Sequence, residues 1–191
     1  MRKDQLFANI PLLQDEVIAL HSIEDKDANQ LFKIYNNKQI FEYCGILNKN
    51  NLETVRNMIQ HFDRDFNKQQ RIKWGIFEKT KDELMGIIEI MEIEQMVGSV
   101  TIGYYSHPEY WNKGYTKRAV NLVQEYLFEQ IAVNRIAAYV MPKNENSKKV
   151  LLVSGFLKEG LIRQGHIWSG KGIVDLELYG QLKADYDKRK P

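Results

Sequence analysis

The spacing of hydrophobic positions changes several times along the chain, and each change predicts a different element. An apolar run at 17–20 predicts a first strand. Apolar residues at i, i+3, i+4 and i+7 then predict two amphipathic helices. One covers about 28–35, and the other begins at Asn50, where Asn50 and Glu53 resemble a capping box. Two helices therefore separate the first strand from the second.

From position 71 the hydrophobic period shortens to two residues, which is typical of strands. Alternating runs at 72–77, 84–94 and 100–105 are separated by short polar turns. This pattern predicts three antiparallel strands joined by hairpins. Pro108 follows the third run and marks its end.

The second half of the chain predicts a βαβ crossover. Apolar residues at 119–127 lie on one helical face, and a nearly all-apolar run at 136–140 is typical of a central strand. A short helix at 145–154, capped by Asn144, follows. Strands at 157–163 and 173–182 come last, with a mobile glycine-rich hairpin at 165–172 between them and a frayed tail at 185–191.

Composition narrows the class of protein. A length of 191 residues fits one domain, expected over 1–191 with its core at about 11–182. The net charge of +2 argues against a nucleic-acid partner. The single cysteine, Cys44, excludes an internal disulfide and a multi-cysteine metal site. Without a signal-peptide pattern or a long apolar run, we expect a soluble cytoplasmic protein with no metal and no membrane partner.

The stretch at 110–119 joins a predicted strand to the clearest predicted helix. It carries one glycine, Gly114, and three basic residues, Lys113, Lys117 and Arg118. Free backbone N–H groups and the positive end of the helix dipole suit a phosphate at such a place. The alternative is an ordinary helix start with a solvated basic turn. The position of the loop at the carboxyl end of a parallel strand favours an anion site.

The order of elements and several motifs resemble the GNAT acyltransferase superfamily, and within it the RimJ/RimL-type branch. The motifs are Gly103-Tyr104, Pro108, Tyr110-Trp111, Lys113-Gly114-Tyr115, Asn144-x-x-Ser147, Gly155-Phe156, Glu159-Gly160, Arg163, Asp175 and Tyr179. Asn112 and Thr116 depart from the usual Gly and Ala of the branch. The resemblance implies a mixed α+β fold: a central, mostly antiparallel sheet of about seven strands with helices on both faces.

The resemblance also implies acetyl-CoA as donor, a primary amine as acceptor and direct transfer between them. It places the coenzyme against Tyr105, Ser106, Trp111, Asn112, Lys113, Gly114, Tyr115, Thr116, Lys117, Asn144 and Ser147. Ser147 is the expected donor to the leaving thiolate; its alternative role is only that of a capped helix residue. By strand alternation, Tyr104 and Tyr105 should point to opposite faces.

The general base is not evident, because the segment 100–106 carries no carboxylate where the superfamily often has one. The candidates are Glu89, Glu92, Glu94, His107, His166, Asp175 and Glu177. We favour Glu92 and Glu94, near the end of the predicted meander, although each could be a solvated strand residue. Cys44 is expected to be buried rather than nucleophilic. Trp74, Trp168 and the hairpin at 165–172 are expected to shape the acceptor pocket.

The amine's own pKa bears on its identity. An α-amine is about 10–20% neutral at pH 7, whereas a lysine amine is about 0.04% neutral. A site without an evident base therefore favours a protein N-terminal α-amine, such as that of a ribosomal protein. The alternatives are a small-molecule amine, such as an antibiotic or a polyamine, and a non-catalytic acyl-CoA-binding module. The last strands could also form a homodimer contact.

Overall fold

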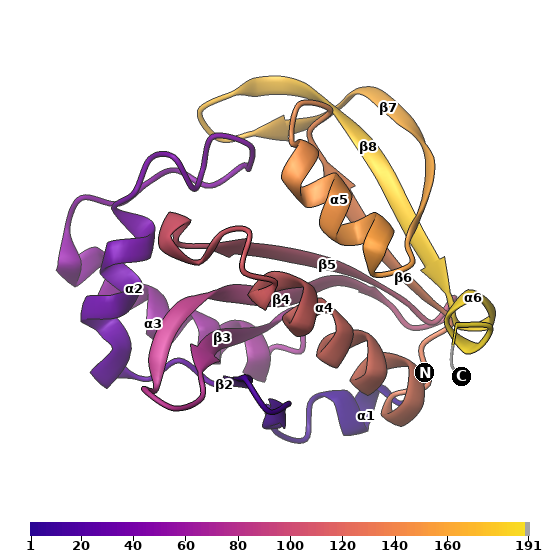
Figure 1. Cartoon of the computed structure of the whole chain (residues 1–191), viewed down its shortest axis with the longest axis horizontal. Coiled ribbons are helices and arrows are strands. Elements are labelled where there is room, and N and C mark those ends of the chain that lie inside the picture. Colours follow the sequence, from indigo (N-terminus) through magenta and orange to yellow (C-terminus); the bar gives the residue numbers. More distant parts are fainter. Residues whose placement is uncertain (190–191) are drawn as a thin grey trace.

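The computed structural model describes residues 1–189, which form an eight-stranded sheet with helices packed against it (Figure 1). The strand order is β1-β2-β3-β4-β5-β6-β8-β7. The strands are β1 (Leu13–Gln14), β2 (Ile18–His21), β3 (Ile72–Glu78), β4 (Glu83–Glu94), β5 (Ser99–Ser106), β6 (Arg135–Val140), β7 (Leu157–Trp168) and β8 (Gly172–Leu182). The helices are α1 (Lys3–Leu6), α2 (Ala28–Tyr35), α3 (Leu52–Asn67), α4 (Tyr115–Glu125), α5 (Glu145–Val153) and α6 (Lys183–Asp187).

The predicted α+β architecture is confirmed. Only β5 and β6 pair in parallel among the described strands, and every other pairing is antiparallel. Eight strands stand where about seven were expected, and one of them is the two-residue strand β1. The crossover from β5 through α4 to β6 is the predicted βαβ unit.

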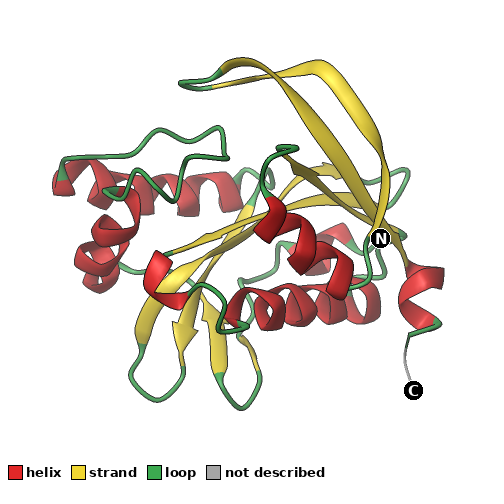
Figure 2. Ribbon diagram, turned by 45° about the horizontal axis from the view of Figure 1, so that its top comes forward, coloured by secondary structure: helices red, strands yellow, loops and turns green. Residues whose placement is uncertain are grey.

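Helices cover both faces of the sheet and bury a separate apolar core on each (Figure 2). On one face, α4 and α5 pack over β3–β6 through residues such as Val123 and Leu151. On the other face, α2 and α3 pack through residues such as Leu31 and Ile59. Alternation along β5 sends Tyr104 to the first core and Tyr105 to the second, as predicted.

The parallel pair β5–β6 separates after a short contact, and this separation positions the site. Register runs from Ser99↔Arg135 to Thr101↔Ala137 and then stops. Beyond it, β5 continues on the β4 side only, to Ser106↔Gly86. The edge of β5 that faces β6 is therefore unpaired with β6 from position 102 onward.

The C-terminal elements are more regular than the sequence suggested. The predicted hairpin at 165–172 is present but is mostly strand, because β7 extends to Trp168 and β8 begins at Gly172, which leaves residues 169–171 as the connection; its mobility stays a prediction. The tail is not frayed at 183–187, since these residues form α6 and Tyr186 packs against the ring of Phe128. The remaining tail positions 190 and 191 lie outside the described residues.

Two further predictions, one for the start of α3 and one for Trp74 in β3, were also wrong. The side chain of Asn51, not Asn50, caps α3 by accepting the N–H of Thr54. Trp74 does not shape a pocket, because it is fully buried in the core under α4 and its indole N–H donates to the carbonyl of Pro11. Its place in the β3 alternation, opposite Ile88, sends it to that face.

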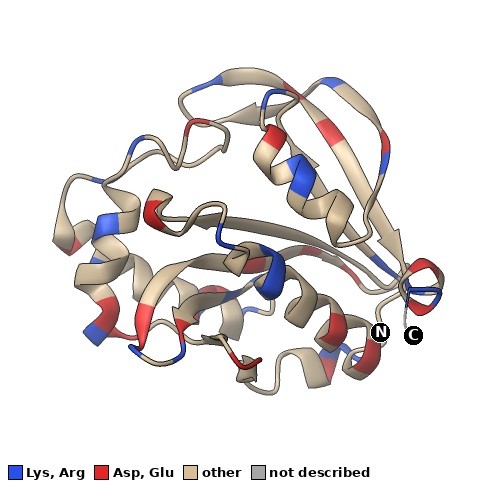
Figure 3. Ribbon diagram, viewed as in Figure 1, with Lys and Arg blue, Asp and Glu red and all other residues tan. Residues whose placement is uncertain are grey.

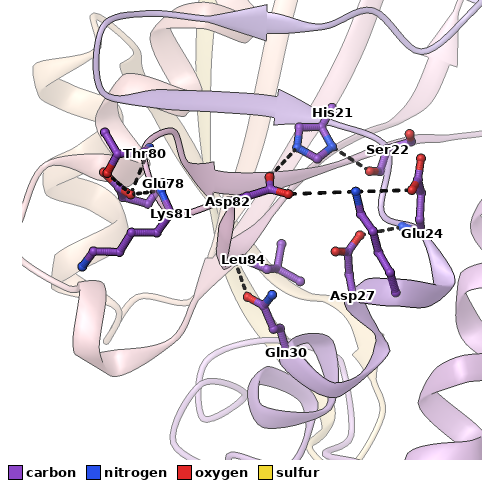
Figure 4. Close-up of polar contacts among 11 residues, drawn as sticks. His21, Ser22, Glu24, Asp27, Gln30, Glu78, Thr80, Lys81, Asp82 and Leu84 are labelled. Atoms are coloured by element: carbon purple, nitrogen blue, oxygen red, sulfur yellow. Dashed lines mark hydrogen bonds and ion pairs between the residues drawn. The ribbon is translucent and has the colours of Figure 1, made fainter.

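Polar contacts tie the β3–β4 turn to the start of α2 (Figure 4). The ring of His21 stacks on Phe77 and lies 3.5 Å from Asp82 in that turn. The backbone N–H of Leu84 donates to the side chain of Gln30 at 2.6 Å. These contacts fix α2 against the sheet, and with it the Tyr35 side chain described below.

Candidate active site

A pocket of about 910 Å³ opens where β5 and β6 separate, and residues from both faces of the sheet line it. We call its opening on the α4/α5 face the α4 mouth, formed by Asn112, Gly114, Thr116, Lys117, Asn144 and Ser147. The opening on the α2/α3 face is the α2 mouth, formed by the loop 39–46, Arg71, Glu89, His166 and Trp168. The pocket therefore connects two sides of the sheet through its gap.

The loop before α4 owes its shape to two residues in the left-handed region. Asn112 has φ 59° and Gly114, the residue before α4, has φ 83°. Glycine and asparagine adopt this conformation most readily. The indole N–H of Trp111 donates to the carbonyl of Ser106 at 2.8 Å and anchors the loop to the end of β5. The first N–H groups of α4 have no partner inside the helix, so this loop can bind an anion.

Positive side chains reinforce the α4 mouth. Lys117, Lys143 and Lys149 line it, and Figure 3 shows Lys and Arg at the start of α4 and on α5. Arg118, expected to add to this charge, is engaged elsewhere: it pairs with Asp15 at 2.8 Å and Glu16 at 2.6 Å. The anion site therefore depends on lysines and backbone.

Most residues expected to touch a coenzyme do line this pocket. Those that line it are Tyr105, Ser106, Trp111, Asn112, Gly114, Thr116, Lys117, Asn144 and Ser147. Lys113 and Tyr115 are not among the lining residues. Tyr115 packs against the main core, and the Lys113 ammonium lies 5.8 Å from the centre of the Tyr110 ring.

Ser147 makes contacts that a simple helix residue would not need. Its backbone N–H donates to the side chain of Asn144 at 3.2 Å, which is the predicted cap. Its hydroxyl also lies 2.9 Å from the Tyr104 hydroxyl, at the α4 mouth of the pocket. Burial raises the pKa of Tyr104, which keeps its phenol protonated and able to donate.

The α2 mouth combines aromatic rings with charged side chains. Its loop at 39–46 meets the tip of the β7–β8 hairpin, where a Cβ on Gly45 would lie 2.7 Å from the Trp168 ring. Below it, the hydroxyls of Tyr35 and Tyr105 are hydrogen-bonded to each other in the buried core. Burial raises the pKa of both phenols, so both stay neutral.

A buried charge cluster forms the floor of the α2 mouth. One carboxylate oxygen of Glu89 accepts hydrogen bonds from Lys73 and, at 3.1 Å, from Arg71. The side chains of Lys73 and Glu89 are 8% and 5% exposed. Burial lowers the pKa of Lys73, although the neighbouring Glu89 opposes that shift.

The seven base candidates fall into two groups. Glu89, Glu92 and His166 line the pocket. Glu92 sits at a bulge in β4 and accepts a hydrogen bond from the Thr101 hydroxyl at 2.8 Å, while His166 packs beside the Tyr139 ring. Glu94, His107, Asp175 and Glu177 do not line it. Glu94 is exposed and accepts the backbone N–H of Met96 in the β4–β5 turn.

Several lining residues were not anticipated: Arg71, Met91, Tyr139, Lys143 and Lys149. Met91 is two residues from Glu89 on β4 and so shares its face, and Arg71, just before β3, contacts Glu89 directly. The alternation along β4 could have indicated this face for Met91. For Lys143 and Lys149, proximity to the predicted cap Asn144 was the available signal. Nothing in the sequence indicated that the loop 39–46 closes the pocket.

The gap between β5 and β6 therefore has a helix start suited to an anion on one face of the sheet and a second group of lining residues on the other, an arrangement in which two reactants could meet. The comparisons identify the family. Residues 18–157 match the model of the acetyltransferase (GNAT) domain. The chain therefore belongs to the GNAT acetyltransferases, and the predicted RimJ/RimL-like branch is supported.

Relatives extend over nearly the whole chain. The chain is 32% identical to the uncharacterized N-acetyltransferase YoaA of Bacillus subtilis, over 91% of this chain and 97% of that protein. It is 28% identical to the putative ribosomal N-acetyltransferase YdaF of B. subtilis, covering 92% and 97%. It is 21% identical to spermidine N(1)-acetyltransferase of Vibrio cholerae, covering 90% and 96%.

The fold is shared with a solved structure of an acetyltransferase that holds acetyl-CoA. The microcin C7 self-immunity acetyltransferase MccE, in complex with acetyl-CoA and AMP, superposes with a TM-score of 0.79 at 20% identity, covering 88% of this chain and 93% of that one. GNAT acetyltransferases use acetyl-CoA, and this chain is an acetyl-CoA-dependent N-acetyltransferase. The basic loop at the α4 mouth and the unpaired edge of β5 suit a phosphate-bearing donor.

Residues 1–189 contain neither a membrane-spanning helix nor a cluster of metal ligands. No helix in this range is long and apolar enough to cross a bilayer. The same residues contain no group of three or more His, Cys, Asp or Glu side chains placed to hold a metal ion.

Proposed function

We propose that this enzyme acetylates the N-terminal α-amine of a protein or peptide. The observation that carries the proposal is the charge balance at the α2 mouth. Glu89 is buried there and already paired with Lys73 and Arg71. A polyamine needs several uncompensated carboxylates, whereas a single α-amine does not. The similarity to YdaF, a putative ribosomal N-acetyltransferase, supports the same acceptor.

The coenzyme would enter by the α4 mouth. The loop N–H groups at 112–117 and Lys117 would hold the pyrophosphate, and the pantetheine arm would pair with the edge of β5 from position 102 onward. A backbone N–H of that edge would polarise the thioester carbonyl. The Ser147 hydroxyl, held 2.9 Å from the Tyr104 hydroxyl, would donate to the leaving thiolate.

The amine would reach the thioester from the α2 mouth and attack directly, so orientation supplies much of the rate. Its nitrogen forms the new bond to the carbonyl carbon, the C–S bond breaks, and the sulfur takes a proton. Glu92 remains our candidate for accepting the amine's proton because it lines the pocket. His166 meets the same criterion. Glu94 is no part of the proposal, since it is exposed at the end of β4, does not line the pocket and accepts the backbone N–H of Met96.

Mass spectrometry of an acceptor panel tests the proposal. The panel holds ribosomal-protein N-terminal peptides, the same peptides with a blocked α-amine and an internal lysine, spermidine, and an aminoglycoside. We expect acetyl transfer to the free α-amine alone or at least tenfold faster than to the other amines. Acetylation of the blocked peptides at equal rates would contradict it. If no amine in a broad panel consumes acetyl-CoA, a non-catalytic binding module becomes the better description.

A small polyamine is the second candidate. Its support is the similarity to spermidine N(1)-acetyltransferase and the presence of Glu42 and Glu92 along the pocket. Preferred turnover of spermidine in the same panel would select it. Under either candidate, a cytoplasmic location stays a prediction.

A homodimer is a further part of the proposal. Several large apolar side chains are exposed on β7, β8 and α5: Leu152, Leu157, Leu161, Ile167 and Ile173. β7 is also the outer strand of the sheet. Light scattering at micromolar concentration should give twice the chain mass, and Leu157→Lys should reduce it to one; a monomer in the wild type would contradict the dimer.

A further inference from the structure

Glu89 presents one anchored oxygen and one open oxygen. Its Oε2 accepts hydrogen bonds from both Lys73 and Arg71. Within residues 1–189, Oε1 has no hydrogen-bond partner. Two other side-chain polar atoms in this range are fully buried without a partner, and Oε1 is not one of them. Glu89 lines the pocket, and Oε1 is the oxygen that Lys73 and Arg71 leave available to a ligand there. The carboxylate is thus held in place by two cations on one side and offers an acceptor on the other.

Gly103 leaves the path to this oxygen clear. It pairs with Glu89 across β4 and β5, in the part of β5 that has separated from β6. A Cβ at Gly103 would lie 3.6 Å from Glu89 Oε1 and 3.0 Å from the end of Met91. The φ of Gly103 does not lie in the left-handed region, so its backbone does not require glycine. The missing side chain instead keeps Oε1 in contact with the gap where the thioester would lie.

Arg71 adds a donor beside this acceptor. Its side chain is 38% exposed, lines the pocket and uses only Nη1 in its contact with Glu89. A guanidinium carries five N–H donors, so others can reach a ligand. An N-terminal residue has the matching groups: an amine that donates, and a carbonyl oxygen on the adjacent carbon that accepts. A lysine side chain or a polyamine has no carbonyl in that position.

We propose that Glu89 and Arg71 form the subsite for the first residue of the acceptor. Glu89 Oε1 accepts a hydrogen bond from the α-amine, and Arg71 donates to the carbonyl oxygen of the same residue. This assignment rests on the proposed function and specifies its substrate class as α-amino acyl compounds. It also gives Gly103 a role in admitting the amine.

The first test is Gly103→Ala, which leaves the Glu89 cluster intact. The flexible end of Met91 can yield, so the fold should persist. We expect the KM for an acceptor peptide to rise about tenfold or more. Because the pantetheine arm would run along the same strand, the Kd for acetyl-CoA is measured in parallel, and the rise in acceptor KM should exceed any change in that Kd. The control is Gly160→Ala, where a Cβ meets nothing within 4 Å. An unchanged acceptor KM in Gly103→Ala would overturn the assignment.

The second test compares a peptide with its analogue whose first carbonyl is reduced to methylene. Wild-type enzyme should prefer the intact peptide, and Arg71→Met should lose about tenfold of that preference. Arg71→Lys should retain part of it. A preference unchanged in Arg71→Met overturns the role of Arg71. If wild type acetylates only polyamines, the substrate class and the proposed function both fail; if it acetylates α-amines without any carbonyl preference, only this inference fails.

Discussion

The α4 mouth is shaped by backbone, whereas the α2 mouth is shaped by side chains from distant segments. At the α4 mouth, Asn112 and Gly114 turn the chain, and the start of α4 provides N–H groups within one short stretch. At the α2 mouth, Glu89, Trp168 and the loop 39–46 come from three separate parts of the chain. The acetyl-CoA donor can be held by the backbone of one short segment. The amine acceptor would have to be recognised by side chains that folding brings together from several segments.

The largest expected effect breaks the α4 mouth alone. Gly114→Glu places a carboxylate and a strained left-handed residue in the loop, so acetyl-CoA binding should be lost. Wild type at a hundred times Kd should gain about 2.7 kcal/mol of stability from acetyl-CoA, seen as a higher Tm. The variant should show no such gain.

Gly172→Glu is the matched control for that experiment. Gly172 also has a positive φ (73°), has open space around its Cβ position and does not line the pocket. It should keep the acetyl-CoA-dependent rise in Tm. Equal rises in Gly114→Glu and the control would remove the loop from the coenzyme site.

The next effect separates chemistry from binding at the α4 mouth. Ser147→Ala should lower kcat by about a hundredfold, because a positioned proton donor contributes on that scale. Tyr104→Phe should cause a smaller loss, since it keeps the Ser147 hydroxyl and removes only the contacts of the Tyr104 hydroxyl with the hydroxyl and the backbone carbonyl of Ser147. Steady-state kinetics and calorimetry measure kcat and acetyl-CoA affinity. A kcat unchanged in Ser147→Ala would show that Ser147 is only a capped helix residue, and acetyl-CoA affinity lost in proportion to kcat would show that its hydroxyl serves binding rather than proton donation.

A third change examines the α2 mouth without touching the coenzyme. Tyr35→Phe removes one of two hydrogen-bonded buried hydroxyls and leaves Tyr105 without this partner. The free energy of unfolding should fall by about 1–3 kcal/mol. Urea denaturation measures it, with Tyr43→Phe as the control at a less buried tyrosine. A fall in acetyl-CoA affinity of similar size would show that the two mouths are coupled.

The smallest expected effect is on the pH dependence of alkylation at Cys44. Burial raises the pKa of the Cys44 thiol at the α2 mouth, so its thiolate fraction at any given pH is below that of an exposed cysteine. Alkylation by iodoacetamide, followed by mass spectrometry, should therefore accelerate at higher pH than for a peptide cysteine. A profile that matches the peptide would mean that the α2 mouth is open to water.

These two mouths also explain what the sequence could predict. The order of elements along the chain, the βαβ crossover and the loop at Gly114 follow from hydrophobic period and turn residues, which are local signals. The burial of Trp74 and the position of Glu89 depend on which face of the sheet a helix covers. That helix is distant in sequence from the strand that carries the residue. Glu94 was favoured for its position near the end of the meander, but beyond the bulge after Met91 it is exposed at the end of β4, where it accepts the backbone N–H of Met96. The regularity of β7 and β8 escaped prediction because glycines at 165, 170 and 172 resemble a loop, although the strands pair almost to the tip.

The alternation of β5 has an evolutionary consequence. Tyr104 and Tyr105 are neighbours in sequence, yet one contacts Ser147 and the other contacts Tyr35 on the opposite face. Inserting or deleting one residue between Thr101 and Tyr104 would reverse every side chain that follows. Descendants of this enzyme can therefore change acceptor by substitution in the surrounding loops, but the length of this short segment should stay constant in any lineage that keeps the reaction.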